Sequence, residues 1–361
     1  MNLKNKNILL ISPEPWNHIF VSKHHYATHL AKKGNKVFYL NPPSNSDRIE
    51  KIDFENLFSV HYTGFIKGLR FFPQFLQKHV IGKKFEQLQH LCKVKFDIVW
   101  SFDNSVFFDF SALPEEVFCI SHIVDLNQDF EFKKAAKTAD LCLGVSKPIV
   151  DKLKLYNNNS FYINHGFNED NKSDQSAKIK LPGKERVKAF YAGNLNILYL
   201  DWDLVKACVN KFSNVDFVFA GPWRNNDIKD MLSSKNNFHY LGVLSSSELS
   251  KYYQCSDILL IIYKYSEFPD QLSNSHKMME YLASGKMILA TWTEEYQLLA
   301  KRGLIKMAKT DEDYVEMFSA IINNIGFWNS EKMQEERKKF AKKNTYNNQI
   351  KAIEKILANG N

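Results

Sequence analysis

The chain has 361 residues, of which 44% are hydrophobic and 24% charged, with a formal net charge of +8, a composition typical of globular proteins that excludes extensive disorder. A chain of this length exceeds what one hydrophobic core usually serves, so the sequence predicts two domains. The five scattered cysteines lack disulfide-framework or zinc-site spacing, and no apolar run reaches the ~18 residues of a membrane span, so we expect a cytoplasmic protein.

The first half of the chain alternates short apolar runs with helical segments. Runs at 7–12 and 36–40 flank a helical stretch that ends at Gly34, which predicts a strand-helix-strand unit with parallel pairing. Further strands are expected at 96–102, 117–125, 141–146 and 160–167. This pattern predicts an α/β first domain over residues 1–170, built on a doubly wound parallel sheet.

Residues 67–96 form a basic segment with interspersed aromatic side chains. It holds seven Lys or Arg residues against one acid, Glu86, and it includes Phe71, Phe72, Phe75 and Phe85. Such a segment suits an anionic membrane surface, on the inner face of the cell membrane for a cytoplasmic protein. The alternative is a solvated helix face backed by core phenylalanines. Nucleic acid is not expected as a partner, because no recognition motif accompanies the charge.

The second half repeats the alternation after a polar break. Residues 171–185 are almost free of apolar side chains, as expected of a linker, and the pattern of strands and helices restarts at 186. A second α/β domain is therefore predicted over 186–340, with strands expected at 187–194, 215–222, 237–243, 256–263 and 287–292. A basic helical segment at 341–361 closes the chain and can pack back on the first domain.

Ligands of open parallel sheets bind at the carboxyl ends of the strands, so the residues that follow each strand are the candidates for chemistry. Neither domain has the GxGxxG turn of a dinucleotide fold or the GxxxxGK[ST] phosphate loop. Nicotinamide-dependent dehydrogenases and P-loop kinases are therefore disfavoured.

The stretch SNSHKMMEYLASGKMILATW, residues 273–292, predicts a helix that starts near Asn274 and Ser275, ends at Gly285 and leads into a strand. Lys277 in the first turn is unfavourable beside a helix N-terminus unless an anion binds there, so it suggests a bound phosphate. Glu280, one turn later, could accept hydrogen bonds from two hydroxyl groups of a ribose or sugar. The alternative is a plain i,i+3 ion pair between the two side chains.

The segment HKMMEYLASGKMILAT resembles the donor-binding helix and strand of GT-B glycosyltransferases, in particular those of family 4, also called glycosyl transferases group 1. The resemblance extends to FYAGNL at 190–195, FVFAGP at 217–222, residues 238–262, ISHIVD and LCLGVS, in consistent order over nearly the whole chain. It implies a GT-B fold, in which two Rossmann-like doubly wound domains face a central cleft, with the acceptor in the first and the nucleotide sugar in the second.

The resemblance also implies roles for individual residues. Glu280 matches the glutamate that binds the nucleotide ribose, and the residues implied at the diphosphate are Asn274, Ser275, His276, Lys277, Gly193 and Asn194. Gly242 and Val243 fall where backbone groups hold the base. His122 matches a histidine that reaches the sugar and acceptor, and Asp125 follows it on the acceptor side.

The chain departs from the family pattern at three places. Leu272 stands where family 4 enzymes often carry a second glutamate, which Asp270 or Glu267 could replace. PEPWNH replaces the glycine-rich turn after the first strand. The basic residue that usually follows the second-domain glycine loop is missing, so charge neutralisation could fall to Lys277, Arg224 or His276.

The resemblance therefore predicts an enzyme that moves a sugar from a UDP- or GDP-linked donor to a glycan or lipid-linked acceptor in cell-surface polysaccharide biosynthesis. Retention of the anomeric configuration is implied by the family alone. An obligatory metal is not expected, because no DxD motif follows a strand. The alternatives are a non-catalytic GT-B-like binding or scaffold subunit and a UDP-sugar epimerase.

Overall fold

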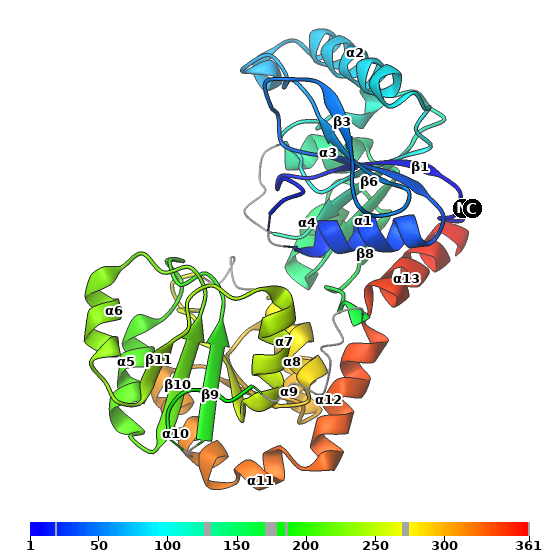
Figure 1. Ribbon diagram of the computed structural model, residues 1–361. Helices are drawn as coiled ribbons and strands as arrows, with labels where there is room; N and C mark the ends of the chain where they lie inside the picture. Colours follow the sequence, from blue (N-terminus) through cyan, green and yellow to red (C-terminus); the bar gives the residue numbers. More distant parts are fainter. Residues whose placement is uncertain (19, 126–130, 170–178, 185–186, 269–273, 360–361) are drawn as a thin grey trace. The chain divides into compact units, whose positions relative to one another are not determined.

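The computed structural model describes residues 1–18, 20–125, 131–169, 179–184, 187–268 and 274–359. These residues form two compact units, one made of Met1–Gly166 with Tyr346–Asn361 and the other of Phe167–Thr345 (Figure 1). The chain leaves the first unit at Gly166 and returns to it at Tyr346. Among the described helices, none is long and apolar enough to cross a membrane.

The first unit is built on an eight-stranded sheet with the order β3-β4-β2-β1-β5-β6-β7-β8. All neighbouring strands are parallel except the edge pair β3 and β4, which the sequence pattern did not predict. The strands are β1 (Asn7–Ile11), β2 (Lys36–Leu40), β3 (Arg48–Lys51), β4 (Leu57–His61), β5 (Ile98–Ser101), β6 (Phe118–Ile123), β7 (Leu141–Gly144) and β8 (Ser160–Tyr162). Four of the five β1 residues are buried, because β1 is central in the sheet and apolar clusters cover both of its faces.

The helices of the first unit include a segment from the far end of the chain. They are α1 (Ser22–Lys32), η1 (Leu69–Phe71), α2 (Gln74–Cys92), η2 (Phe110–Ala112), α3 (Phe132–Thr138), α4 (Lys147–Lys154) and α13 (Tyr346–Asn359). The terminal helix α13 packs against α1, where Lys33 forms an ion pair of 2.8 Å with Glu354. The sequence pattern predicted one closing helix, but the structure breaks the basic segment at Asn344 and Thr345, so that α12 and α13 belong to different units.

The second unit is built on a six-stranded parallel sheet with the order β11-β10-β9-β12-β13-β14. Its strands are β9 (Val187–Ala192), β10 (Val215–Ala220), β11 (Phe238–Tyr240), β12 (Ile258–Ile261), β13 (Met287–Thr291) and β14 (Lys306–Ala308). Its helices are α5 (Trp202–Lys211), α6 (Asn226–Ser233), α7 (Ser246–Cys255), α8 (Lys277–Ser284), η4 (Glu294–Tyr296), α9 (Gln297–Lys301), α10 (Asp311–Asn323), α11 (Ile325–Trp328) and α12 (Glu331–Lys343). The strand order reverses between β9 and β12, which makes this the position where an open sheet binds its ligands.

A buried arginine fixes the carboxyl end of α8. Arg337 of α12 donates to the carbonyl oxygens of Leu304 at 2.7 Å, Gly285 at 3.0 Å and Trp328 at 2.7 Å. Gly285 is the left-handed residue that ends α8, so the guanidinium meets the negative end of the helix dipole. Burial lowers the pKa of Arg337 to about 10, and the side chain therefore stays charged at neutral pH.

Replacing Arg337 with methionine is expected to lower the free energy of unfolding by about 3 kcal/mol, because three carbonyl groups lose their donor. Urea unfolding followed by circular dichroism measures the change. Lys339→Met, on an exposed position of the same helix, is the matched control and should change stability by less than about 0.5 kcal/mol. Equal stabilities of the two variants would contradict the proposed role of Arg337.

Candidate functional site

The strand-order reversal brings the loop after β9 against the start of α8. Gly193 follows β9 with φ 157°, and its backbone N–H donates to the carbonyl of Ala220 at 3.0 Å. A Cβ atom at position 193 would lie 2.7 Å from the Lys277 Nζ atom. The absence of a side chain at Gly193 therefore makes room for the lysine amine beside the loop backbone.

Lys277 has a buried amine with no counter-ion among the described residues. Its Nζ atom makes no hydrogen bond within the part of the chain that the structure describes, and it lies 4.1 Å from the centre of the Tyr191 ring and 5.1 Å from that of Tyr263. Burial lowers the pKa of the amine to about 7, although the Glu280 carboxylate acts in the opposite direction. A lysine held in this way at a helix N-terminus can receive an anion with its full charge.

The helix begins slightly later than the sequence predicted. Asn274 and Ser275 precede the N-cap residue, His276, which makes no side-chain capping bond in the described structure. Ser275 instead donates its backbone N–H to the Tyr296 hydroxyl at 2.6 Å. The helix therefore begins two residues after Ser275, and the Met278 N–H of its first turn donates to the Ser275 carbonyl at 3.1 Å.

Glu280 lies one turn along α8 and faces a tyrosine. Its Oε2 atom accepts a hydrogen bond of 3.3 Å from the Tyr253 hydroxyl of α7, and burial raises its pKa to about 6. Both Lys277 and Glu280 are described, yet no ion pair joins them. The alternative of a plain i,i+3 ion pair is therefore wrong, and both side chains keep hydrogen-bonding capacity for something else.

The other predicted donor residues follow neighbouring strands at the same sheet edge. Asn194 and Arg224 are exposed, and both contact Asn196, whose backbone N–H donates to Asn194 Oδ1 at 3.0 Å and whose own Oδ1 accepts the Arg224 backbone N–H at 2.7 Å. Gly242 has φ 76°, and its carbonyl accepts the Gly221 N–H at 2.7 Å. Val243 is 65% exposed. The structure thus brings Lys277 and Gly193 into contact. Asn194, Arg224 and Val243 are open to solvent along the same edge of the sheet.

In the first unit, the two predicted catalytic residues differ in environment. His122 lies inside β6 with no exposed surface, accepts the Trp100 Nε1–H at 3.3 Å through Nδ1, and stacks on Phe102. Burial lowers its pKa to about 3, so its ring is neutral. Its Nε2 atom has no hydrogen-bond partner among the described residues. Asp125 is exposed beyond the end of the strand, beside residues 126–130, which lie outside the described residues.

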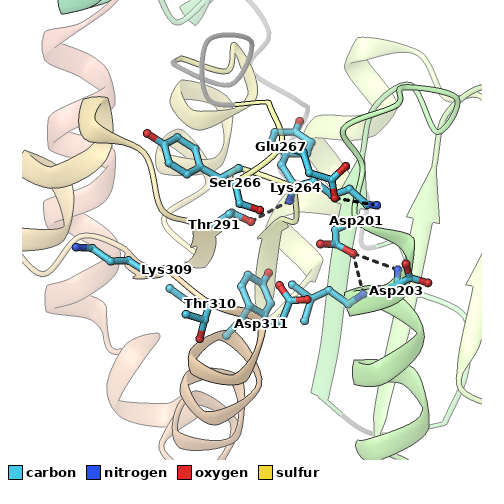
Figure 2. Close-up of a pocket in the computed structure, with 14 residues that line it drawn as sticks. Asp201, Asp203, Lys264, Ser266, Glu267, Thr291, Lys309, Thr310 and Asp311 are labelled. Atoms are coloured by element: carbon cyan, nitrogen blue, oxygen red, sulfur yellow. Dashed lines mark hydrogen bonds and ion pairs between the residues drawn. The ribbon is translucent and has the colours of Figure 1, made fainter.

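A pocket in the second unit, with a volume of about 180 Å³, was not predicted from the sequence (Figure 2). It lies where β13 and β14 end and where α5 and α10 begin. Two of its acids have structural partners, since Asp201 accepts the N–H groups of Asp203 and Leu204, and Glu267 pairs with Lys264 at 3.3 Å. Glu267 is therefore engaged locally. Asp270, the other candidate for a second acid, and Leu272, which stands in place of the glutamate, lie outside the described residues.

Of the tyrosines around Lys277 and Glu280, Tyr263 was among the strand-end candidates in the sequence, whereas Tyr191 and Tyr253 were missed. Tyr191 is the penultimate residue of β9, Tyr263 follows β12, and Tyr253 is near the end of α7. Their positions in the sequence could have indicated a role in the site, because Tyr191 and Tyr263 lie at the carboxyl ends of β9 and β12. These are the neighbouring strands between which the strand order reverses. Among the described residues, no cluster of three or more His, Cys, Asp or Glu side chains could hold a metal ion.

No protein-family model matches the sequence, and no curated protein matches it. Solved structures match at the level of the fold. Sucrose-phosphate synthase from Thermosynechococcus elongatus has a TM-score of 0.71 at 12% identity, covering 98% of both chains. The structure described as "Trehalose-6-phosphate from E. coli bound with UDP-2-fluoro glucose" has a TM-score of 0.67 at 11% identity, covering 97% of this chain and 98% of that one. Anabaena Alr3699/HepE in complex with UDP and glucose has a TM-score of 0.64 at 11% identity, covering 98% of this chain and 99% of that one.

The chain has a GT-B fold. The prediction of two α/β domains with doubly wound parallel sheets is therefore confirmed. At identities of 11 and 12%, the similarity to these structures shows a shared fold and nothing more. Membership of family 4 stays a prediction.

Proposed function

We propose that the protein is a glycosyltransferase that binds the diphosphate of a nucleotide sugar at the start of α8. The observation that carries this proposal is the buried Lys277 amine, which has no counter-ion among the residues that the structure describes and lies against the Gly193 loop where the strand order reverses. A diphosphate would supply that counter-ion. The charge would in turn stabilise the nucleoside diphosphate as the leaving group, which is where negative charge develops in the reaction.

The remaining edge residues fit the other parts of a nucleotide. Glu280, one turn after Lys277, would accept hydrogen bonds from the ribose hydroxyls, and the backbone at Gly242 and Val243 would hold the base. Asn194, Arg224, His276 and the N–H groups of the first turn of α8 would contribute around the diphosphate. These roles rest on the positions of the residues along one sheet edge and on the resemblance to GT-B glycosyltransferases.

In the reaction, the bond between the anomeric carbon and the diphosphate oxygen breaks, a bond to an acceptor hydroxyl oxygen forms, and the proton of that hydroxyl passes to the departing diphosphate. His122 keeps its proposed place on the acceptor side by resemblance alone, since its side chain has no exposed surface and a pKa of about 3 makes it a weak base. Asp125, which is exposed, would lie on the acceptor side. Retention of configuration is part of the proposal by resemblance.

We propose a UDP-linked donor, with a GDP-linked donor as the second choice, because two of the structures with this fold hold UDP or a UDP sugar. The proposed acceptor is a glycan or lipid-linked sugar of cell-surface polysaccharide biosynthesis, as expected for family 4. A sugar phosphate is the competing acceptor, since the similar structures include sugar-phosphate synthases. The proposed location is the cytoplasm, at the inner face of the cell membrane.

A scaffold subunit and a UDP-sugar epimerase remain the rivals of this proposal. An epimerase would convert a UDP sugar without any acceptor, and a scaffold would show no selectivity among UDP, GDP and TDP sugars. Thermal shift with that donor panel, followed by product analysis with and without acceptors, separates the three functions.

Replacing Glu280 with glutamine is expected to weaken UDP-sugar binding about tenfold, because the amide accepts hydrogen bonds through one oxygen in place of two. Isothermal titration calorimetry measures the affinity. Glu316→Gln, at an exposed position of α10, is the control and should bind as the wild type does. Unchanged affinity in Glu280→Gln would remove Glu280 from the proposed site.

A further inference from the structure

The first unit carries a group of large apolar side chains on its surface between β4 and α2. Phe71 is 77% exposed, Phe75 70% and Ile66 59%. Phe72 and Leu76, at 36% each, complete the group. We call these five residues the aromatic tip. Contiguous exposed apolar residues of this size are uncommon on monomeric proteins and mark interaction sites.

The backbone of the aromatic tip is anchored. Leu69 is buried in the core, and Gly68 makes a left-handed turn directly before η1. The Gln77 amide, itself buried, donates to the carbonyls of Arg70 and Phe72 at 2.8 Å each. The phenylalanines are therefore presented outward by a fixed turn.

Along the chain, the charged residues that flank the aromatic tip have one sign. Residues 56–85 contain five Lys or Arg and no Asp or Glu. Lys67 and Arg70 are exposed within the same turn, and the Arg70 guanidinium lies 4.7 Å from the centre of the Phe71 ring. An apolar centre with a basic rim complements the interface of an anionic bilayer, where aromatic rings insert and cations meet lipid phosphates.

The structure divides the segment that the sequence marked at 67–96. Phe85 and Phe96 are buried in the core with Leu88, as the alternative of core phenylalanines predicted. Phe71 and Phe75 lie on the surface. The apolar part of any membrane contact is thus confined to the first turns of the segment.

We propose that the aromatic tip inserts into the interfacial region of an anionic lipid bilayer and holds the first unit at the membrane surface. Charge complementarity selects this occupant over a second copy of the chain, because two basic rims of net positive charge would repel each other. The inference is independent of the proposed donor site, which lies in the other unit.

Flotation of the full-length protein with vesicles tests the proposal. We expect binding to vesicles that contain phosphatidylglycerol, weaker binding at high salt, and little binding to pure phosphatidylcholine. The double variant Phe71→Ser/Phe75→Ser should lose roughly tenfold or more of the vesicle partitioning, since each ring that inserts contributes apolar area. Lys67→Glu/Arg70→Glu should also lose binding to the anionic vesicles.

The matched control is Phe327→Ser, which removes a phenylalanine of the second unit that is 64% exposed and should leave vesicle binding unchanged. Circular dichroism of each variant verifies folding. Failure of the wild type to bind anionic vesicles would overturn the proposal, as would a double variant that binds like the wild type. Self-association that disappears in the double variant would overturn it as well, by assigning the aromatic tip to a second copy.

Discussion

Replacing Lys277 with methionine is expected to weaken binding of a UDP sugar by about 50- to 100-fold at neutral pH. Methionine keeps the unbranched apolar stem and removes the charge, so the loss reports the interaction between the amine and the diphosphate. A charge-assisted hydrogen bond contributes about 1.5–3 kcal/mol, and here the amine has no competing partner among the described residues. Lys235→Met, at an exposed position just after α6, is the control that should bind normally.

The same lysine predicts a pH dependence whose sign follows from its surroundings. Among the described residues, the groups that face the amine are the Tyr191 and Tyr263 rings and the Glu280 carboxylate, and of these only Glu280 is a carboxylic acid. The free amine has a pKa of about 7, so at about pH 8 it is largely neutral. A bound diphosphate favours the charged form and raises that pKa, so binding takes up a proton. Affinity should therefore fall as the pH rises above about 7.

Calorimetry at about pH 8 in two buffers of different ionisation enthalpy measures this uptake, which should approach one proton per donor. A UDP sugar is the suitable probe, because its diphosphate is a diester and lacks the phosphate ionisation near pH 6. Glu280, with a pKa of about 6, is already ionised in this range and does not contribute. Lys277→Met should show no uptake and a flat profile.

The calorimetry tests the proton uptake and the proposed function separately. Selective UDP-sugar binding without proton uptake would mean that the amine is charged before the donor arrives, and the linkage would be wrong. Absence of any nucleotide-sugar binding would contradict the proposed function itself.

The main features of the site could be predicted from the sequence because they depend on local order. Lys277 and Glu280 stand three residues apart on one helix, and Gly285 ends that helix, so their relative placement follows from helix geometry. The alternation of strands and helices likewise predicted both sheets. The partners of these residues could not be predicted in the same way, since Tyr253 and Arg337 come from other helices and reach α8 only through tertiary packing.

Which phenylalanines of the basic segment 67–96 are buried could not be predicted from the sequence. Phe71, Phe75 and Phe85 occur in one basic segment, and the spacing of Phe71 and Phe75 is as suitable for a core as for a surface. The core places Phe85 inside and leaves the other two outside, because Leu69, Ile81 and Leu88 already fill the contact with the sheet. Composition alone therefore supported two interpretations. Burial of Phe85 confirms the core interpretation for that residue, and membrane contact by Phe71 and Phe75 stays a proposal.

Among substitutions that add one methyl group in the site, Gly221→Ala is expected to destabilise the fold most. Gly221 follows β10 and has φ 136°. A Cβ atom at this position would lie 1.8 Å from the Gly193 carbonyl oxygen and 2.8 Å from its carbon. Both are backbone atoms of the neighbouring loop, and the Gly193 N–H is already bonded to Ala220, so the loop cannot yield locally. Gly221→Ala should therefore destabilise the fold by more than about 4 kcal/mol or prevent folding.

Two further glycine variants show whether the close approach of the loops, rather than the loss of glycine, causes this effect. Gly303 has φ 71° and nothing within 4 Å of a Cβ atom, so Gly303→Ala should cost only about 1–2 kcal/mol of backbone strain. Gly193→Ala would meet the Lys277 Nζ atom, the flexible end of a side chain, so we expect a folded protein with weakened donor binding. Urea unfolding and calorimetry on the three variants measure both properties. If Gly221→Ala were as stable as Gly303→Ala, the two loops could not lie in contact, and the space that holds the Lys277 amine would lose its structural basis.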